Sequence, residues 1–305
     1  MIKNIYEKHY KVLLVIPILI LVLAMFQIGI QYFQTGDFLN KGVSLKGGVT
    51  VNILDSKINN DLIEKNLKIN FPNSDIEIKS LSQAGEKTGL VLKIDLDVNN
   101  DKDILKFKHL IIDTAPNLTL DDIEDNIQTI SPSLGNSFFK TTFKSLIMAF
   151  IFMAIIVFYY FRTIIPSLNV ILAAFSDIIV TLAIVNLMGI KISTAGIAAF
   201  LMLIGYSVDT DILLATKVLK TKKGTVLDRV YAAMKTGLMM SSTTFIAVLI
   251  ALYFTISLEI KQIMSILLIG LIIDLIMTWI QNAGILRIYM ETKTINTETK
   301  NNDQI

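Results

Sequence analysis

The amino-acid sequence predicts an α-helical membrane protein with six transmembrane helices and one α+β domain between the first and second helices. Of its 305 residues, 53% are hydrophobic and only 18% are charged, which is too apolar for a soluble globular chain. Six apolar runs come near the length of about 20 residues that crosses a bilayer. One polar stretch, residues 31–140, separates the first run from the other five.

Residues 1–30 are expected to form a short basic N-terminus and the first transmembrane helix. Three lysines within the first eleven residues precede an apolar run over residues 12–30. A basic start before an apolar run also describes a signal peptide, but Gln31-Tyr32-Phe33-Gln34 lacks the small residues of a cleavage site. The run is therefore interpreted as a retained helix.

Residues 31–140 are expected to form a small α+β domain. Alternating apolar residues predict strands, and apolar residues three or four apart predict helices. The first strand would be broken at Gly47-Gly48. The expected strands cover 43–54, 76–81, 90–96 and 123–130, and the expected helices cover 58–71 and 103–114. This β-α-β-β-α-β order is typical of a ferredoxin-like fold, in which helices cover one face of the sheet.

Residues 141–290 are expected to form a bundle of five further transmembrane helices. Residues 225–235 leave two interpretations open: an amphipathic helix lying at the membrane interface, or a plain extension of the fifth helix. The polar tail, residues 291–305, is predicted to be disordered. The five expected spans are 143–161, 165–188, 192–214, 237–256 and 263–288.

Basic residues in the connections predict the orientation. Five lysines and one arginine lie in the connection between the fourth and fifth helices, against a single acid, Asp228. The positive-inside rule places this connection and both termini in the cytoplasm, and residues 31–140 outside. That domain holds twelve Lys against sixteen Asp and Glu, and this negative balance fits the outer side.

Four carboxylates within the expected spans are the candidate functional residues. Ionisable residues inside a membrane are costly, and they mark ion pathways by default. No Lys or Arg is expected at the same depth, and Lys235 lies toward a helix end. An ion relay is therefore predicted. The four acids are Asp177, Asp209, Asp211 and Asp274.

The two acids of the fourth helix are expected to differ in their surroundings. Asp209 and Asp211 lie about 200° apart around a helix, so both cannot face one neighbour. Asp209, on the face of Gly205, is predicted to face the bundle interior, and Asp211 is predicted to lie nearer the cytoplasmic end. The structural alternative for all four acids is hydrogen bonding to Ser and Thr of neighbouring helices.

The composition also argues against several classes of site. The chain has no cysteine, and its two histidines, His9 and His109, lie far apart in polar surroundings. We therefore expect no metal site and no cofactor. No nucleic-acid partner and no enzymatic activity are expected.

Two motifs give the sequence a resemblance to the SecF family of protein-export membrane proteins, within the resistance-nodulation-division (RND) superfamily. Gly42-Val43-Ser44-Leu45-Lys46-Gly47-Gly48 opens the domain, and Gly205-Tyr206-Ser207-Val208-Asp209 lies in the fourth helix. Lys235-Thr236-Gly237 is similar to the family's entry into the fifth helix. The resemblance covers roughly residues 12–290 and looks archaeal. Bacterial members carry an Asn-Asp pair where this chain has Asp209-Thr210, so the acid is displaced by one residue.

The resemblance implies an accessory subunit of the Sec translocase in the cytoplasmic membrane. The implied partners are a SecD-like subunit that completes an RND-type bundle, the translocon channel, the exported polypeptide and membrane lipids. An ion gradient would drive motion of the external domain. The implied roles are ion relay for Asp209, with Lys235 as the nearest cation, and shaping of the domain's root for Gly47-Gly48.

Two other functions stay open on the residues alone. An RND-type exporter of lipids or small molecules would need a porter cavity, for which a single small domain offers little room. An intramembrane aspartyl protease would use Asp177 and Asp209 as a dyad, which requires two acids that share a proton.

Overall fold

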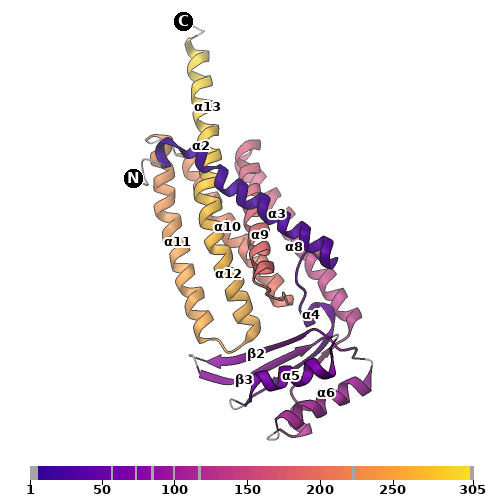
Figure 1. Ribbon diagram of the computed structural model, residues 1–305. Coiled ribbons are helices and arrows are strands. Elements are labelled where there is room, and N and C mark those ends of the chain that lie inside the picture. The colour runs from indigo at the N-terminus through magenta and orange to yellow at the C-terminus, as the bar shows by residue number, and fades with distance from the viewer. Residues whose placement is uncertain are drawn as a thin grey trace.

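The computed structural model describes residues 6–55, 58–72, 74–83, 86–98, 100–115, 118–221 and 224–302, with side chains described as far as residue 293. The chain is mostly helical, with a small antiparallel sheet at one end of a bundle of long helices (Figure 1). The described start of the chain and the end of the last helix lie at the opposite end of the bundle from the sheet.

Within the described part of the chain, six helices are long and apolar enough to cross a membrane. The short helix α2 (Tyr10–Leu13) leads into the first span, and the π-helix η1 continues the last one. The long helices are α3 (Val15–Thr35), α8 (Pro132–Phe161), α9 (Ile164–Leu187), α10 (Thr194–Lys220), α11 (Val226–Phe254) and α12 (Leu258–Ile276), followed by η1 (Met277–Asn282) and α13 (Ala283–Asn302).

Two segments of the bundle, residues 226–235 and the tail after residue 291, are helical, and local sequence signals explain why. Residues 226–235 form the start of α11, so the extension is the correct interpretation: a capping box of Thr225 and Asp228 starts the helix, which then runs unbroken to Phe254. The tail predicted to be disordered from residue 291 is helical as far as Asn302. It contains no Gly or Pro that would end α13.

The antiparallel sheet has four strands in the order β2-β3-β1-β4. Helix α5 follows β1, helix α6 follows β3, and the short α7 precedes β4. The strands are β1 (Gly48–Ile53), β2 (Ile76–Gln83), β3 (Glu86–Ile94) and β4 (Ile127–Ile130), and the helices are α5 (Asn60–Asn70), α6 (Asp101–Thr114) and α7 (Leu120–Glu124).

One face of the sheet carries the core of this domain. Val51 and Leu92 of the sheet pack with Leu67 of α5 and Phe107 of α6, and all four are buried. The opposite face turns toward the bundle, where Lys93 lines a small polar cavity together with residues of the helix connections. The sheet thus lies as a layer between α5 and α6 on one side and the ends of the long helices on the other (Figure 1).

Two expected strands are shorter than the apolar pattern indicates. Residues 43–46 form a helical turn, α4 (Val43–Lys46), because Gly42 starts it and Gly47 ends it with a φ of 99°. Ile123 lies in α7 instead of a strand, because Thr119 and Asp122 form a capping box ahead of it. The strands begin at Gly48 and Ile127.

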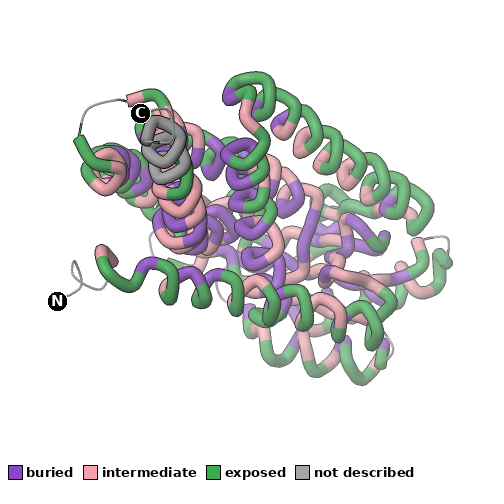
Figure 2. The backbone as a smooth tube through the Cα atoms, turned by 90° about the horizontal axis from the view of Figure 1, so that it is seen from above, coloured by how far each residue is buried: buried purple, intermediate pink, exposed green. Residues whose placement is uncertain are grey.

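The domain is joined to the bundle by backbone and side-chain contacts. Ile192, in the connection between α9 and α10, donates its N–H to the Asn40 carbonyl at 2.6 Å and accepts from the Gly42 N–H at 2.8 Å. Lys191 pairs with Asp75 at 2.5 Å. Burial gathers in the centre of the bundle, while the peripheral helices are exposed along their outer faces (Figure 2).

Candidate functional site

Three of the four predicted acids meet in the centre of the bundle. Asp177 of α9, Asp211 of α10 and Asp274 of α12 are each at most 1% exposed. The carboxyl groups of Asp177 and Asp274 lie close enough for their charges to interact, and two carboxylates this close favour a proton on one of them. The hydroxyl of Ser207 on α10 donates to Asp177 Oδ2.

Thr278 of η1 links the other pair of acids. Its hydroxyl oxygen lies 3.1 Å from Asp211 Oδ1 and 3.0 Å from Asp274 Oδ1. A hydroxyl carries one hydrogen, so it donates to one carboxyl and must accept from the other if both contacts are hydrogen bonds. In that case the second contact needs a proton on one of the two acids, so the geometry favours a proton within this cluster.

A line of amides extends the acid cluster toward α9. Asn282 Nδ2 donates to Asp211 Oδ1 at 2.6 Å. Asn169 Nδ2 in turn donates to Asn282 Oδ1 at 2.5 Å and to its backbone carbonyl at 3.0 Å. These two amides are at most 3% exposed, so the network runs through the interior. It connects α9, α10 and the last membrane-spanning segment.

The π-helix η1 places two of these partners. A π-helical turn contains one more residue than an α-helical turn and is frequent at functional sites. Here it begins three residues after Asp274 and directs Thr278 and Asn282, four residues apart, toward Asp211. The local irregularity brings a hydroxyl and an amide to the same carboxyl oxygen.

The described residues supply no cation to this cluster. The buried polar residues include no Lys or Arg among the described part of the chain. Asp177 Oδ1 and Asp211 Oδ2 are buried without a hydrogen-bond partner within the described protein, and so are Gln281 Oε1 and Thr181 Oγ1. Such an arrangement is suited to hold and exchange protons or small cations.

Asp209 does not face the interior, contrary to the prediction from the sequence. It is exposed and shares an outward stripe of α10 with Met202, Gly205 and Tyr206. Asp211, predicted to lie at a wet helix end, is fully buried. The two acids do lie on opposite faces of α10, as expected from their separation of about 200°. The inward face is that of Asp211, because the buried Leu203, Ser207 and Leu214 turn it toward α9 and α12.

The outward position of Asp209 also excludes the dyad of Asp177 and Asp209. The two acids lie on opposite sides of α10, since Asp177 contacts Ser207 on the inner face. Lys235 is exposed on α11 and forms no ion pair among the residues described. The acid cluster therefore forms without Asp209 and without Lys235.

The predicted glycine motif lies where the domain joins the bundle. Gly47 and Gly48 have φ angles of 99° and 138°, which L side chains rarely adopt. A Cβ on Gly47 would lie 2.6 Å from the backbone of Pro132, at the start of α8, and one on Gly48 would lie 2.4 Å from the Ile94 carbonyl. Gly135 contacts Gly47 in the same way.

The sequence analysis did not single out Asn169, Thr278 or Asn282. Each is a polar residue within an apolar span, and Asn282 is four residues after Thr278, which itself is four after Asp274. That spacing puts Asp274, Thr278 and Asn282 on one face of an ideal helix. The polar stripe would have identified the face of the last span that carries the site.

Fold and site together define a multi-pass membrane protein with a buried acid cluster and an inserted α+β domain. The family described as "Protein export membrane protein SecD/SecF, C-terminal" matches residues 113–292. A protein-export membrane protein SecF from Pyrococcus furiosus is 35% identical over 94% of both chains. One from Methanocaldococcus jannaschii is 40% identical over 93% of this chain and 96% of the relative.

A solved structure supports the same fold. The crystal structure of SecDF, a translocon-associated membrane protein from Thermus thermophilus, matches with a TM-score of 0.70 at 17% identity. The match covers 92% of this chain and 38% of that longer chain. The chain belongs to the SecD/SecF family of protein-export membrane proteins. It is a multi-pass protein of the cell membrane.

Proposed function

We propose that the chain acts as a SecF-like accessory subunit of the Sec protein translocase and promotes protein export across the cytoplasmic membrane. Its likeness to SecF proteins over nearly its whole length supports this role. The translocon channel and the exported polypeptide are its further partners in this proposal. In this proposal the domain of residues 31–140 is ferredoxin-like, which its β-α-β-β-α-β order supports.

The observation that carries the mechanism is the cluster of Asp177, Asp211 and Asp274. Each of these acids accepts a hydrogen bond from a neighbouring side chain, so a proton entering or leaving changes which of the contacts between α9, α10 and the last span are attractive. Moving one charge through 100 mV supplies about 2.3 kcal/mol. The membrane potential or a proton gradient would thereby shift the packing of these helices.

Asp209 has a different role in this proposal, as part of the surface that binds a SecD-like subunit. A carboxylate exposed on the middle of a membrane-spanning helix is costly against lipid. Gly205 lies one turn before it on the same face, and an added Cβ on Gly205 would meet nothing within 4 Å. Small residues let another helix approach closely. The partner helix would cover Asp209 and complete an RND-type bundle.

The proposed orientation puts both termini in the cytoplasm and the α+β domain outside. The basic connection between α10 and α11 supports the cytoplasmic side of the termini. The termini and the domain lie at opposite ends of the bundle in agreement with this arrangement.

The test is export of a secreted reporter in cells that depend on this chain. Asp211→Asn keeps a hydrogen-bonding group but removes the titratable one, and we expect it to lower the export rate by up to roughly 40-fold, the equivalent of one charge moved through 100 mV. Asp101→Asn, an exposed acid of α6, is the matched control and should leave export unchanged.

Asp209→Asn separates the two proposed roles. It should weaken co-purification of the SecD-like subunit, whereas Asp211→Asn should leave that complex intact. Normal export with Asp211→Asn in an intact complex would contradict the relay. Substrate-dependent transport of a lipid or small molecule by the purified chain alone would favour the alternative of an RND-type exporter.

A further inference from the structure

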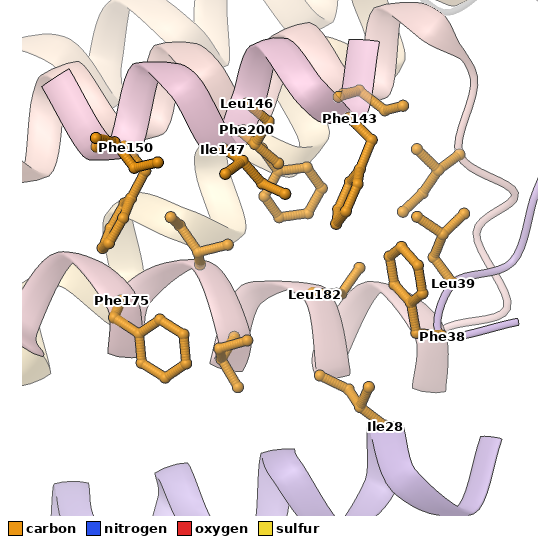
Figure 3. Close-up of a pocket in the computed structure, with 15 residues that line it drawn as sticks. Ile28, Phe38, Leu39, Phe143, Leu146, Ile147, Phe150, Phe175, Leu182 and Phe200 are labelled. Carbon is orange, nitrogen blue, oxygen red and sulfur yellow. The ribbon is translucent and has the colours of Figure 1, made fainter. Parts of the chain in front are cut away.

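An apolar cavity of about 430 Å³ lies between α3, α8 and α9, away from the acid cluster (Figure 3). Phe143 and Phe150 of α8 face Phe175 and Leu182 of α9 across it, and Ile28 of α3 closes one side. Every side chain that lines it is aliphatic or aromatic. Its volume falls in the range of roughly 300–1,000 Å³ that is usual for ligand sites.

The cavity opens to the outer surface of the bundle. Ile147 and Ile151 of α8 are each 45% exposed, and Phe175 of α9 is 38% exposed, although all three line the cavity. In a membrane-spanning bundle this surface meets lipid. Water needs two to four polar partners to be stable in a cavity, and this one offers none. A hydrocarbon chain restores the dispersion contacts that an empty cavity lacks.

Two lysines lie at the domain end of the same open side. Lys140 and Lys144 are exposed, and neither forms an ion pair within the described part of the chain. With Ile147 and Ile151 they follow the spacing i, i+4, i+7 and i+11, which is one stripe along a helix. The stripe therefore changes from apolar at the cavity to cationic at the end of α8 near the domain.

Aromatic rings mark the depth of this change. Phe38, which lines the cavity, lies 5.9 Å from Phe139 and 5.1 Å from Phe143 between ring centroids. Lys41 Nζ lies 4.4 Å from the centroid of the Phe139 ring. Aromatic and basic residues gather at the level of the lipid head groups. The two free lysines are thus at head-group level while the cavity is at chain level.

We propose that this cavity holds a hydrocarbon chain of an anionic phospholipid, whose phosphate binds Lys140 and Lys144. The apolar lining accounts for the chain, and the two cations on the same stripe account for the negative head group. The lipid fills the gap between α3 and α8, both of which pack against α9. It belongs to the folded protein as a bound ligand.

The test is native mass spectrometry of the purified full-length chain after titration with phosphatidylglycerol or phosphatidylcholine of identical acyl chains. We expect one phosphatidylglycerol to be retained in preference to phosphatidylcholine. Lys140→Ala with Lys144→Ala should weaken phosphatidylglycerol binding roughly 25-fold, from about 1 kcal/mol per lysine near an anionic lipid. Lys217→Ala, an exposed lysine of α10 at the other end of the bundle, is the control.

Ile147→Trp tests the chain site, because a larger side chain at the open edge fills the cavity without disturbing a buried position. It should abolish retention of both lipids. Ile156→Trp on the exposed face of α8, outside the cavity lining, should leave retention unchanged. Retention that survives Ile147→Trp would overturn the site. Equal retention of the two lipids by the unaltered chain would overturn the assignment of an anionic head group, as would replacement of the lipid by a partner's helix in the purified complex.

Discussion

Gly237 of α11 shows how a missing side chain sets the position of the acid cluster. An added Cβ there would lie 2.3 Å from Cζ2 of Trp279 and 3.3 Å from Cγ2 of Thr210. Trp279 is 4% exposed and directly follows Thr278, which contacts Asp211 and Asp274. The indole ring thus packs on Gly237, and this contact holds η1 against α11.

Gly237→Ala is expected to displace Trp279 and to lower the free energy of unfolding by about 1–3 kcal/mol, because it overpacks a buried contact. Trp279 is the single tryptophan of the chain, so its fluorescence reports the change directly. Acrylamide quenching should increase and the emission maximum should move to longer wavelength.

Gly205→Ala is the matched control, since nothing lies within 4 Å of the added Cβ. It should leave both the fluorescence and the thermal midpoint unchanged. Unaltered quenching in Gly237→Ala would show that η1 does not depend on this contact.

At the scale of single residues, the sequence identifies the four acids but not which of them face the interior of the bundle. All four lie in apolar runs, and three of them converge. The choice between Asp209 and Asp211 depends on which face of α10 packs inward, and this helix has apolar residues on both faces, such as the exposed Met202 and the buried Leu203. Hydrophobic periodicity carries little information where lipid and core are equally apolar.

At the scale of elements, the junction between the domain and α8 combines an unusual backbone conformation with close packing at Gly47. Gly47→Ala introduces a side chain at a φ of 99° and 2.6 Å from Pro132, so strain and overpacking add. We expect a loss of about 2–5 kcal/mol in the free energy of unfolding. Circular dichroism of the full-length chain in detergent would measure it.

Gly36→Ala separates the two contributions. Gly36 ends α3 with a φ of 76°, but nothing lies within 4 Å of an added Cβ. This variant carries backbone strain alone, about 1–2 kcal/mol. Equal losses in the two variants would mean that the contact between Gly47 and Pro132 adds nothing to the stability.

Long helices were predictable because their apolar runs are long, whereas short elements were not. The described α9 begins and ends within one residue of the predicted span, 165–188. The start of α8 at Pro132 precedes its apolar run because Ser131 caps it with a side-chain hydrogen bond to Leu134. Helix caps and glycine positions decide such boundaries, and the pattern of apolar residues does not reveal them.

For the whole molecule, a small set of polar contacts holds the domain against the bundle. Lys191 pairs with Asp75 at 2.5 Å, and Lys261 donates to the Ser82 carbonyl at 2.9 Å. The side chains of the ion pair are 24% and 37% exposed, so solvent screens it. Exposed pairs of this kind contribute about 0.2–1 kcal/mol. The ion pair therefore adds little to the docking of the domain.

Asp75→Asn should shift the population toward undocked domains by a factor of up to about 5, which corresponds to about 1 kcal/mol. The chain has no cysteine, so spin labels at Lys102→Cys and Met188→Cys would report the distance between domain and bundle. The distance distribution should broaden in the variant and in high salt.

Glu64→Gln is the control, because Glu64 pairs with Lys68 inside α5 and does not touch the bundle. It should leave the distribution unchanged. A narrow distribution with Asp75→Asn would mean that the backbone contacts alone fix the domain.

The backbone contacts of Ile192 couple the domain to the bundle. Ile192 ties the lead-in to the domain to the turn between the two helices that bear Asp177 and Asp211. From Asp211 to Ser193 the helix is about 27 Å long at 1.5 Å per residue, so a tilt of about 5° at the level of the acids displaces that turn by about 2 Å. A tilt of α10 at the acid cluster would therefore move the attached base of the domain.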